Sequence, residues 1–179
     1  MDIVNLSRDL MIKQTEYNKA PAWLLTEIAI EKGKELSDKH DCRKDLVLAS
    51  LYLAHTIFSP KWKGDIQKNH TELSAEFAEK HLVRWDVKKE DKDIILNSIR
   101  SHHGKARAES KVAEIVKNAE CFKFTTVKGS LVYLHELGRR EECYEEAVKK
   151  VIDKMEQKIS LLTLEDCKKE ADKDCKTIR

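Results

Sequence analysis

Apolar side chains recur at spacings of three and four positions along almost the whole chain. This period matches the turn of an α-helix and places the apolar residues on one face. The pattern predicts helices over about 3–17, 22–38, 43–58, 70–84, 88–102 and 109–124. Farther along, it predicts a helix that ends at Gly138, a long charged helix over about 140–161, and a last helix that Thr163 opens. The expected fold class is therefore all-α.

Two of these helices depart from the ordinary amphipathic pattern. The helix over 43–58 is apolar on nearly every face from Leu46 to Leu53, which is typical of a central buried helix. The charged helix over 140–161 carries one apolar stripe, formed by Val148, Val151, Ile152, Met155 and Ile159. That stripe must be covered, either by packing on the rest of the domain or by a second copy of the chain. Both interpretations stay open, so a homodimer is possible.

Residues that break helices are scarce, because the chain holds only 5 glycines and 2 prolines. Pro60 is expected to stop the helix over 43–58, and Gly104 the helix over 88–102. Gly129 is expected to mark a break before the segment SLVYLHELG. No repeat and no linker stands out. We therefore predict a single all-α domain over 1–179 with a C-terminal helical extension.

The charge of the chain excludes several classes of partner. Charged residues make up 37% of the sequence, but the net charge is only +2, which predicts a soluble protein without strong attraction to nucleic acid or membranes. No apolar run is long enough to span a bilayer, and the first ten residues do not resemble a signal peptide. The five cysteines are odd in number and form no CxxC, so we expect reduced thiols. The expected location is the cytoplasm.

Four of the seven histidines lie at the ends of predicted helices. His55 ends the buried helix, His70 begins the next one, and His102 and His103 end another just before Gly104. Imidazoles from three helix ends can converge on one metal ion. Histidines at helix ends can also be capping or surface residues, and the spacing alone does not separate the two interpretations.

Four segments, in order, resemble the HD-domain superfamily of metal-dependent phosphohydrolases. LASLYLAHTIFS is similar to the helix that carries the His-Asp doublet, and NHTELSAEFAEKHL to the segment after it. IILNSIRSHHGK is similar to the next histidine-bearing helix, and AEIVKNAECFKF to the final Ala-Asp-Lys motif. The resemblance covers about 20–128 and implies an HD-domain helical bundle, with C-terminal helices over about 130–176. It also implies nucleotide or phosphomonoester substrates and a divalent metal such as Mn, Fe, Co, Ni or Zn.

The resemblance carries site roles to particular residues. Its metal ligands fall on His55, His70, His102, His103 and Glu120. Glu72 matches a position that orients a histidine or a water, although a carboxylate there also suits the start of a helix. Lys105 belongs to a group of basic residues that could stabilise charge on a phosphoryl group or could simply be solvated: Lys61, Lys63, Arg100, Lys105 and Arg107.

The sequence departs from the family pattern at three metal-binding positions. Thr56 stands where the doublet has its Asp, Glu120 stands where the last Asp is expected, and no histidine occurs near Pro21 and Ala22. A threonine hydroxyl is neutral and a poor ligand for a hard cation. We therefore predict an incomplete metal site with weak or no catalysis, in a protein that binds a ligand or partner. The alternative is an active phosphohydrolase in which Asp65 replaces the missing carboxylate.

Overall fold

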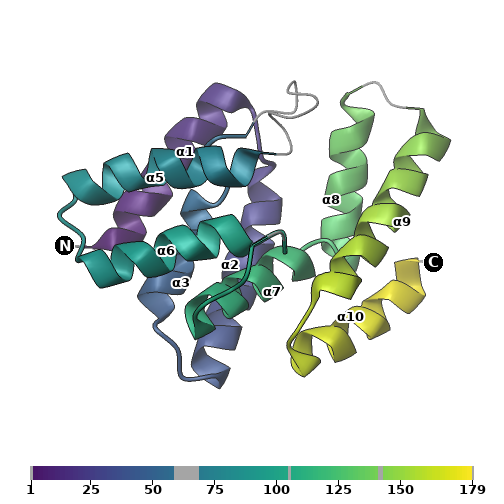
Figure 1. Ribbon diagram of the computed structural model, residues 1–179. Coiled ribbons are helices and arrows are strands. Elements are labelled where there is room, and N and C mark those ends of the chain that lie inside the picture. Colours follow the sequence, from purple (N-terminus) through teal and green to yellow (C-terminus); the bar gives the residue numbers. More distant parts are fainter. Residues whose placement is uncertain (1, 59–68, 105, 141–142, 179) are drawn as a thin grey trace.

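The computed structural model describes residues 2–58, 69–104, 106–140 and 143–178 (Figure 1). Within these ranges the secondary structure consists of α-helices without strands, which confirms the all-α fold class. The helices are α1 (Ile3–Asn18), α2 (Trp23–Lys39), α3 (Lys44–Leu53), α5 (His70–Arg84), α6 (Lys89–Ser101), α7 (Lys111–Phe122), α8 (Val127–Gly138), α9 (Tyr144–Leu161) and α10 (Glu165–Ile178). None of the helices described is long and apolar enough to cross a membrane.

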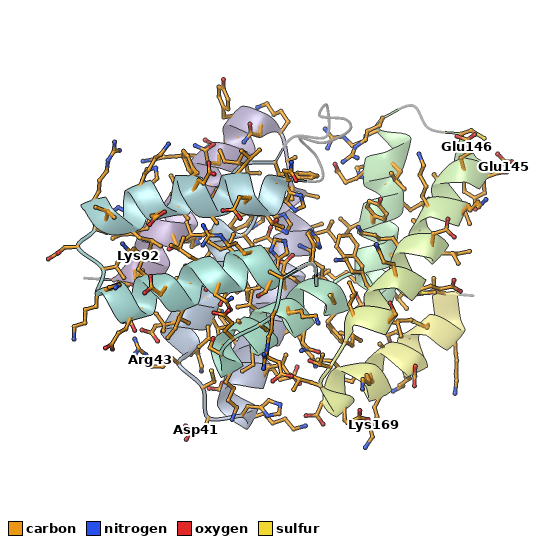
Figure 2. The ribbon with its side chains drawn as sticks, in the orientation of Figure 1. Asp41, Arg43, Lys92, Glu145, Glu146 and Lys169 are labelled. Carbon is orange, nitrogen blue, oxygen red and sulfur yellow. The ribbon has the colours of Figure 1, made fainter. Side chains whose placement is uncertain are left out.

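Helix α3 lies at the centre of the largest hydrophobic core. Every residue from Leu46 to Leu53 is buried, as the sequence predicts, and helices α1, α2, α6 and α7 pack around it. Burying one leucine side chain of this kind stabilises a protein by roughly 1.5–3 kcal/mol. The surface is charged by contrast, with Glu145, Glu146 and Lys169 pointing outward (Figure 2).

The end of α3 differs from the sequence prediction and sets the position of His55. The helix ends at Leu53 instead of continuing to 58. The Thr56 N–H and the Thr56 hydroxyl both donate to the Leu53 carbonyl, at 3.3 and 3.0 Å. These bonds close a turn and satisfy a carbonyl that a longer helix would have used. His55 therefore lies in this turn, one residue beyond the helix cap.

The predicted break at Gly129 is wrong, because this glycine lies inside the first turn of α8. The helix begins at Val127, and the Thr126 hydroxyl accepts from the Gly129 N–H at 3.0 Å as an N-cap. A Cβ on Gly129 would lie 1.7 Å from the Lys123 carbonyl oxygen. Glycine at this position therefore allows the start of α8 to approach the end of α7 closely.

Helices α8 and α9 lie side by side at one end of the molecule, and α10 packs against both (Figure 1). Helix α9 begins at Tyr144, later than predicted, and buries Val151 and Met155 of its apolar stripe against α8 and α7. The last helix begins at Glu165 and not after Thr163, whose N–H instead donates to Asn118. Part of the stripe is thus covered within the chain itself, while Val148 and Ile152 remain partly exposed.

Candidate functional site

Four imidazoles converge on one point between helices that are distant in sequence. His55 follows α3, His70 begins α5, and His102 and His103 follow α6. One ring nitrogen from each of the four lies within 4.8 Å of the others. The convergence that the sequence allowed is therefore present, and imidazoles in this number suit a divalent transition metal such as zinc, nickel or cobalt.

The hydrogen bonds of His55 indicate where its proton lies. Its Nε2 is 2.7 Å from the Glu120 carboxylate, and burial lowers the pKa of His55. Burial alone would raise the pKa of Glu120, but the nearby charge of Lys123 and the contact with His55 outweigh it and hold that pKa well below its usual range. A neutral imidazole that faces an anion donates through Nε2. Its Nδ1 then carries a lone pair, and it has no hydrogen-bond partner in the described part of the chain.

His102 offers a second buried lone pair. Its Nδ1 lies 2.6 Å from the Ile99 carbonyl oxygen and must donate to it, because the oxygen is only an acceptor. Its Nε2 is buried and has no hydrogen-bond partner among the residues described. Burial lowers the pKa of His102 well below its ordinary value, so the ring is neutral. Unpartnered buried nitrogens are rare in proteins, and two of them in one cluster fit a metal ion.

His103 and His70 share one proton in this arrangement. The Lys158 ammonium donates to His103 Nδ1 at 2.6 Å, which leaves the His103 proton on Nε2. That Nε2 lies 3.0 Å from His70 Nε2 and donates to it. A metal held by all four imidazoles would take the place of this shared proton.

Glu120 lies beside the cluster and is already paired. Its carboxylate lies 2.7 Å from the Lys123 ammonium as well as from His55, and the side chains of Glu120 and Lys123 are only 1% and 2% exposed. Carboxylates that hold a histidine by its second nitrogen orient that ring toward a ligand. Glu120 thus holds the His55 ring by its Nε2, and it is not among the residues whose ligand atoms converge.

The described residues with other predicted roles are not part of this cluster. Thr56 is fully buried and its hydroxyl is used by the turn after α3, so it supplies no charge. Glu72 is 51% exposed, pairs with Arg100 at 2.9 Å, and does not line the cavity beside the histidines. Lys61, Lys63, Asp65 and Lys105 lie outside the described residues, and Arg107 is exposed. The roles expected of Glu72 and Lys105 therefore stay predictions.

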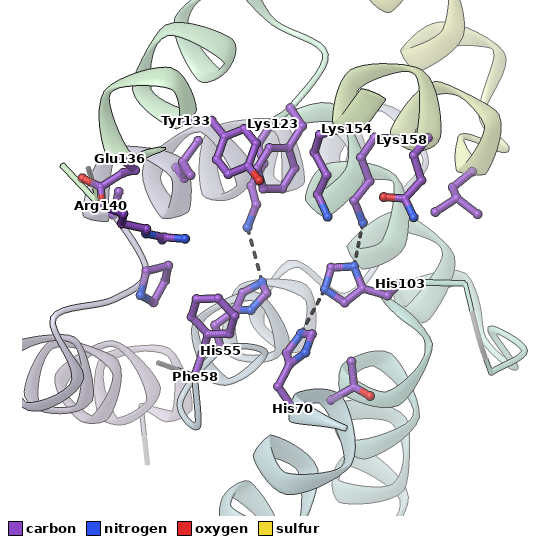
Figure 3. Close-up of a pocket in the computed structure, with 17 residues that line it drawn as sticks. His55, Phe58, His70, His103, Lys123, Tyr133, Glu136, Arg140, Lys154 and Lys158 are labelled. Carbon is purple, nitrogen blue, oxygen red and sulfur yellow. Dashed lines mark hydrogen bonds between the residues drawn. The ribbon is translucent and has the colours of Figure 1, made fainter. Parts of the chain in front are cut away.

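A cavity of about 340 Å³ opens beside the histidines (Figure 3). His55, His70 and His103 form one wall, and the facing wall comes from the end of α7 and from α8 and α9. That facing wall is cationic and aromatic, with Lys123, Phe124, Tyr133, Arg140, Lys154 and Lys158. No role was predicted for any of these residues, although Lys123 and Phe124 lie in the last segment of the resemblance. One signal was available: Lys158 follows Met155 by three positions and Val151 by seven, so it lies on the apolar stripe of α9.

Three lysines of this wall surround one aromatic ring. The ammonium groups of Lys123, Lys154 and Lys158 lie 5.4, 5.4 and 6.0 Å from the centre of the Phe124 ring. Burial, reinforced by the charges of the other two lysines, lowers the pKa of Lys154 to about 8. Burial lowers the pKa of Lys158 as well. Positive charge is thus concentrated here against its own repulsion, as in sites that receive an anion.

Comparisons with known proteins bear on the fold. No protein-family model matches the chain. No curated protein matches it either. Among solved structures, the crystal structure of Bacillus subtilis YpgQ in complex with ADP is similar, with a TM-score of 0.68 and 14% sequence identity. The match covers 98% of this chain and 90% of the YpgQ chain. At this identity the likeness shows a shared fold.

Proposed function

We propose that this chain is an HD-type, phosphohydrolase-like protein that binds a nucleotide or another phosphomonoester in the cavity beside the four histidines, with weak or no catalysis. The observation that carries the proposal is the pairing of two walls, one of imidazoles and one of lysines. Lysine ammonium groups bind phosphate oxygens as point charges, and Phe124 and Tyr133 offer flat faces for a base. The proposal includes a cytoplasmic location.

The fold likeness supports a nucleotide as the ligand. The YpgQ structure of similar fold contains ADP. The cavity of this chain has the volume of a small-ligand site, and its apolar and aromatic side chains stand beside a few charged groups. These features suit a molecule with an aromatic base at one end and phosphate at the other.

A divalent metal is part of the proposal. His55, His70, His102 and His103 would hold it, and two of these rings have buried nitrogens without a partner in the described structure. Bound there, such an ion would polarise a phosphoryl oxygen. The role of Glu120 is to orient His55, and the role of Lys158 is to hold the His103 ring in place.

Weak or absent catalysis follows from the carboxylates. Glu120 is neutralised by Lys123, and Thr56 cannot carry charge. Neither residue can then activate a water or bridge two ions, which are the tasks a carboxylate has in such hydrolases. The second candidate is an active phosphohydrolase with a rearranged metal site. The convergence of four imidazoles within 4.8 Å favours it, since three protein ligands are enough for a catalytic ion.

Calorimetric titration with ADP and AMP tests this proposal. We expect saturable binding by the wild-type protein and about tenfold weaker binding by Lys158→Met, which keeps the side-chain length but removes the charge. Lys149→Met is the matched control, because Lys149 lies exposed on the same helix. An assay of released phosphate, with added zinc, cobalt, nickel or manganese, separates the two candidates, because only an active phosphohydrolase would release phosphate at an appreciable rate. Absence of binding by any nucleotide or phosphomonoester would refute both.

A further inference from the structure

Lys123 places its ammonium beside both an imidazole and a carboxylate of the site. Its ammonium is 2.7 Å from Glu120 and 3.4 Å from His55 Nε2, and its side chain is buried. Burying an unpaired ammonium costs several kcal/mol, and here the carboxylate of Glu120 lowers that cost by pairing with Lys123. One protein cation therefore already stands at the imidazole–carboxylate pair, next to the point where the four imidazoles converge.

The charges around the cavity do not balance. Glu120 offsets Lys123, and Glu136 lines the same cavity as Arg140. No carboxylate of the described residues comes within 4.0 Å of the ammonium of Lys154 or of Lys158. Lys158 is almost fully buried. Two ammonium groups thus face the cavity without a carboxylate partner in the part of the chain that the structure describes, and together they match the charge of one phosphate monoester, which is about −1.5 to −2 at neutral pH.

The orientation of the lysines fits a single ligand group. Lys154 and Lys158 lie one helical turn apart on α9, and Lys123 follows α7 beside them. Figure 3 shows all three side chains extending from the same side, with their nitrogen ends directed toward the histidines. Donors that approach from one side can share the oxygens of one tetrahedral anion.

We propose that Lys123, Lys154 and Lys158 bind a phosphoryl dianion directly, without a metal ion, and that Lys123 provides beside His55 and Glu120 the positive charge that a metal would provide. This inference rests on the proposed function, because it specifies how the same cavity holds its ligand. It makes the phosphate of a nucleotide, or inorganic phosphate itself, the recognised group. The four histidines then tune or add to this binding and are not required for it.

Titration of metal-stripped protein in EDTA tests the inference with four probes: ADP, AMP, adenosine and inorganic phosphate. We expect ADP and AMP to bind in EDTA with dissociation constants within about threefold of those with zinc, and adenosine to bind at least about tenfold more weakly. Lys154→Met should weaken AMP binding in EDTA by about tenfold or more, whereas Lys149→Met should not. If inorganic phosphate binds as tightly as AMP, the site stands and its ligand is free phosphate.

The role of Lys123 needs a variant that folds. Lys123→Met alone would leave Glu120 buried without its partner, so the double variant Lys123→Met/Glu120→Gln removes both charges together. We expect it to remain folded by circular dichroism and to bind AMP in EDTA about tenfold more weakly than wild type.

Three results would overturn the inference. Binding that vanishes in EDTA and returns with metal would do so while leaving the proposed function intact. Binding in EDTA that neither Lys154→Met nor the double variant weakens would place the ligand elsewhere. Absence of binding with and without metal would remove the proposed function as well.

Discussion

At the scale of single residues, the pair formed by Glu120 and Lys123 dominates the energetics of the site. Both side chains are almost completely buried, and Glu120 also holds His55. Removing one member of a buried pair leaves an uncompensated charge, which costs about 3–5 kcal/mol. Replacing both members by uncharged side chains of similar volume is close to neutral. The stability of the site therefore depends on keeping the charges of Glu120 and Lys123 matched, and less on the presence of either residue alone.

We expect Glu120→Gln to lower the free energy of unfolding by about 3–5 kcal/mol, because Lys123 loses its anion. Urea denaturation measures this. Glu72→Gln is the control: it breaks an exposed pair with Arg100 and should cost at most about 1 kcal/mol. Adding Lys123→Met to Glu120→Gln should restore most of the loss. Equal stability of Glu120→Gln and wild type would contradict the paired arrangement.

We expect the binding of a phosphate ligand to depend on pH through Lys154. Burial and the neighbouring charges of Lys158 and Lys123 lower its pKa to about 8. The side chain is a cation below that pH and loses its charge above it, while the phosphate of AMP stays a dianion. The affinity for AMP should therefore fall as the pH rises from 7 to 9. Calorimetry at both pH values measures the change, and Lys154→Met should show a smaller one. An affinity that rises with pH would show that Lys154 does not face the ligand.

At the scale of elements, the contact between α7 and α8 positions the cationic wall. Gly129, in the first turn of α8, lies so close to the Lys123 carbonyl that an added Cβ would be 1.7 Å away. We expect Gly129→Ala to force the two helices apart, lowering the free energy of unfolding by about 1–3 kcal/mol and weakening AMP binding. Chemical denaturation and calorimetry measure the two effects.

Gly138 provides a matched control in the same helix. A Cβ there would meet nothing within 4 Å, so Gly138→Ala should be neutral or stabilise the protein by about 0.5–1 kcal/mol. If Gly129→Ala behaved like Gly138→Ala, the close approach of α7 and α8 would not matter for stability.

Some features of the helices could be predicted from the sequence, and others could not. The buried character of α3 was predictable, because Leu46 to Leu53 are apolar on nearly every face and only burial on all sides suits such a helix. The end of α3 was not predictable. The apolar pattern continues beyond Leu53, but the bonds from Thr56 to the Leu53 carbonyl form a turn there in place of a longer helix. The place of Gly129 inside α8 was not predictable, because it depends on the tight turn that brings this glycine against the Lys123 carbonyl, and the apolar period does not encode that turn.

The two walls of the site also differ in how far the sequence predicts them. The histidine wall was predictable, because four helix-end imidazoles fall within segments that resemble a known family. The lysine wall depends on how α8 and α9 dock against α7, and local spacing does not specify that docking. Lys158 on the apolar stripe was the one local sign of it.

At the scale of the whole molecule, buried neutral histidines connect folding to pH. Burial lowers the pKa values of His55, His102 and His103. The unfolded chain takes up these protons near pH 6.5 and the folded chain does not, so the stability they contribute is present above that pH.

We therefore expect the metal-free protein to lose stability as the pH falls below about 6.5, by up to about 1.4 kcal/mol per pH unit for each histidine that titrates. Urea denaturation between pH 8 and 5 measures it. His102→Asn should flatten the curve by removing one such group. Stability that rises toward pH 5 would contradict buried neutral rings.

We expect the cavity to bind a phosphate ester and to hydrolyse it scarcely at all. Phosphorus NMR of ADP mixed with the zinc-loaded protein tests both parts at once. We expect the ADP resonances to shift and broaden saturably, with little or no inorganic phosphate signal over hours, and to shift and broaden less with Lys158→Met at the same concentration. Unperturbed resonances with the wild-type protein would contradict binding, and a rapidly growing phosphate signal would contradict weak catalysis.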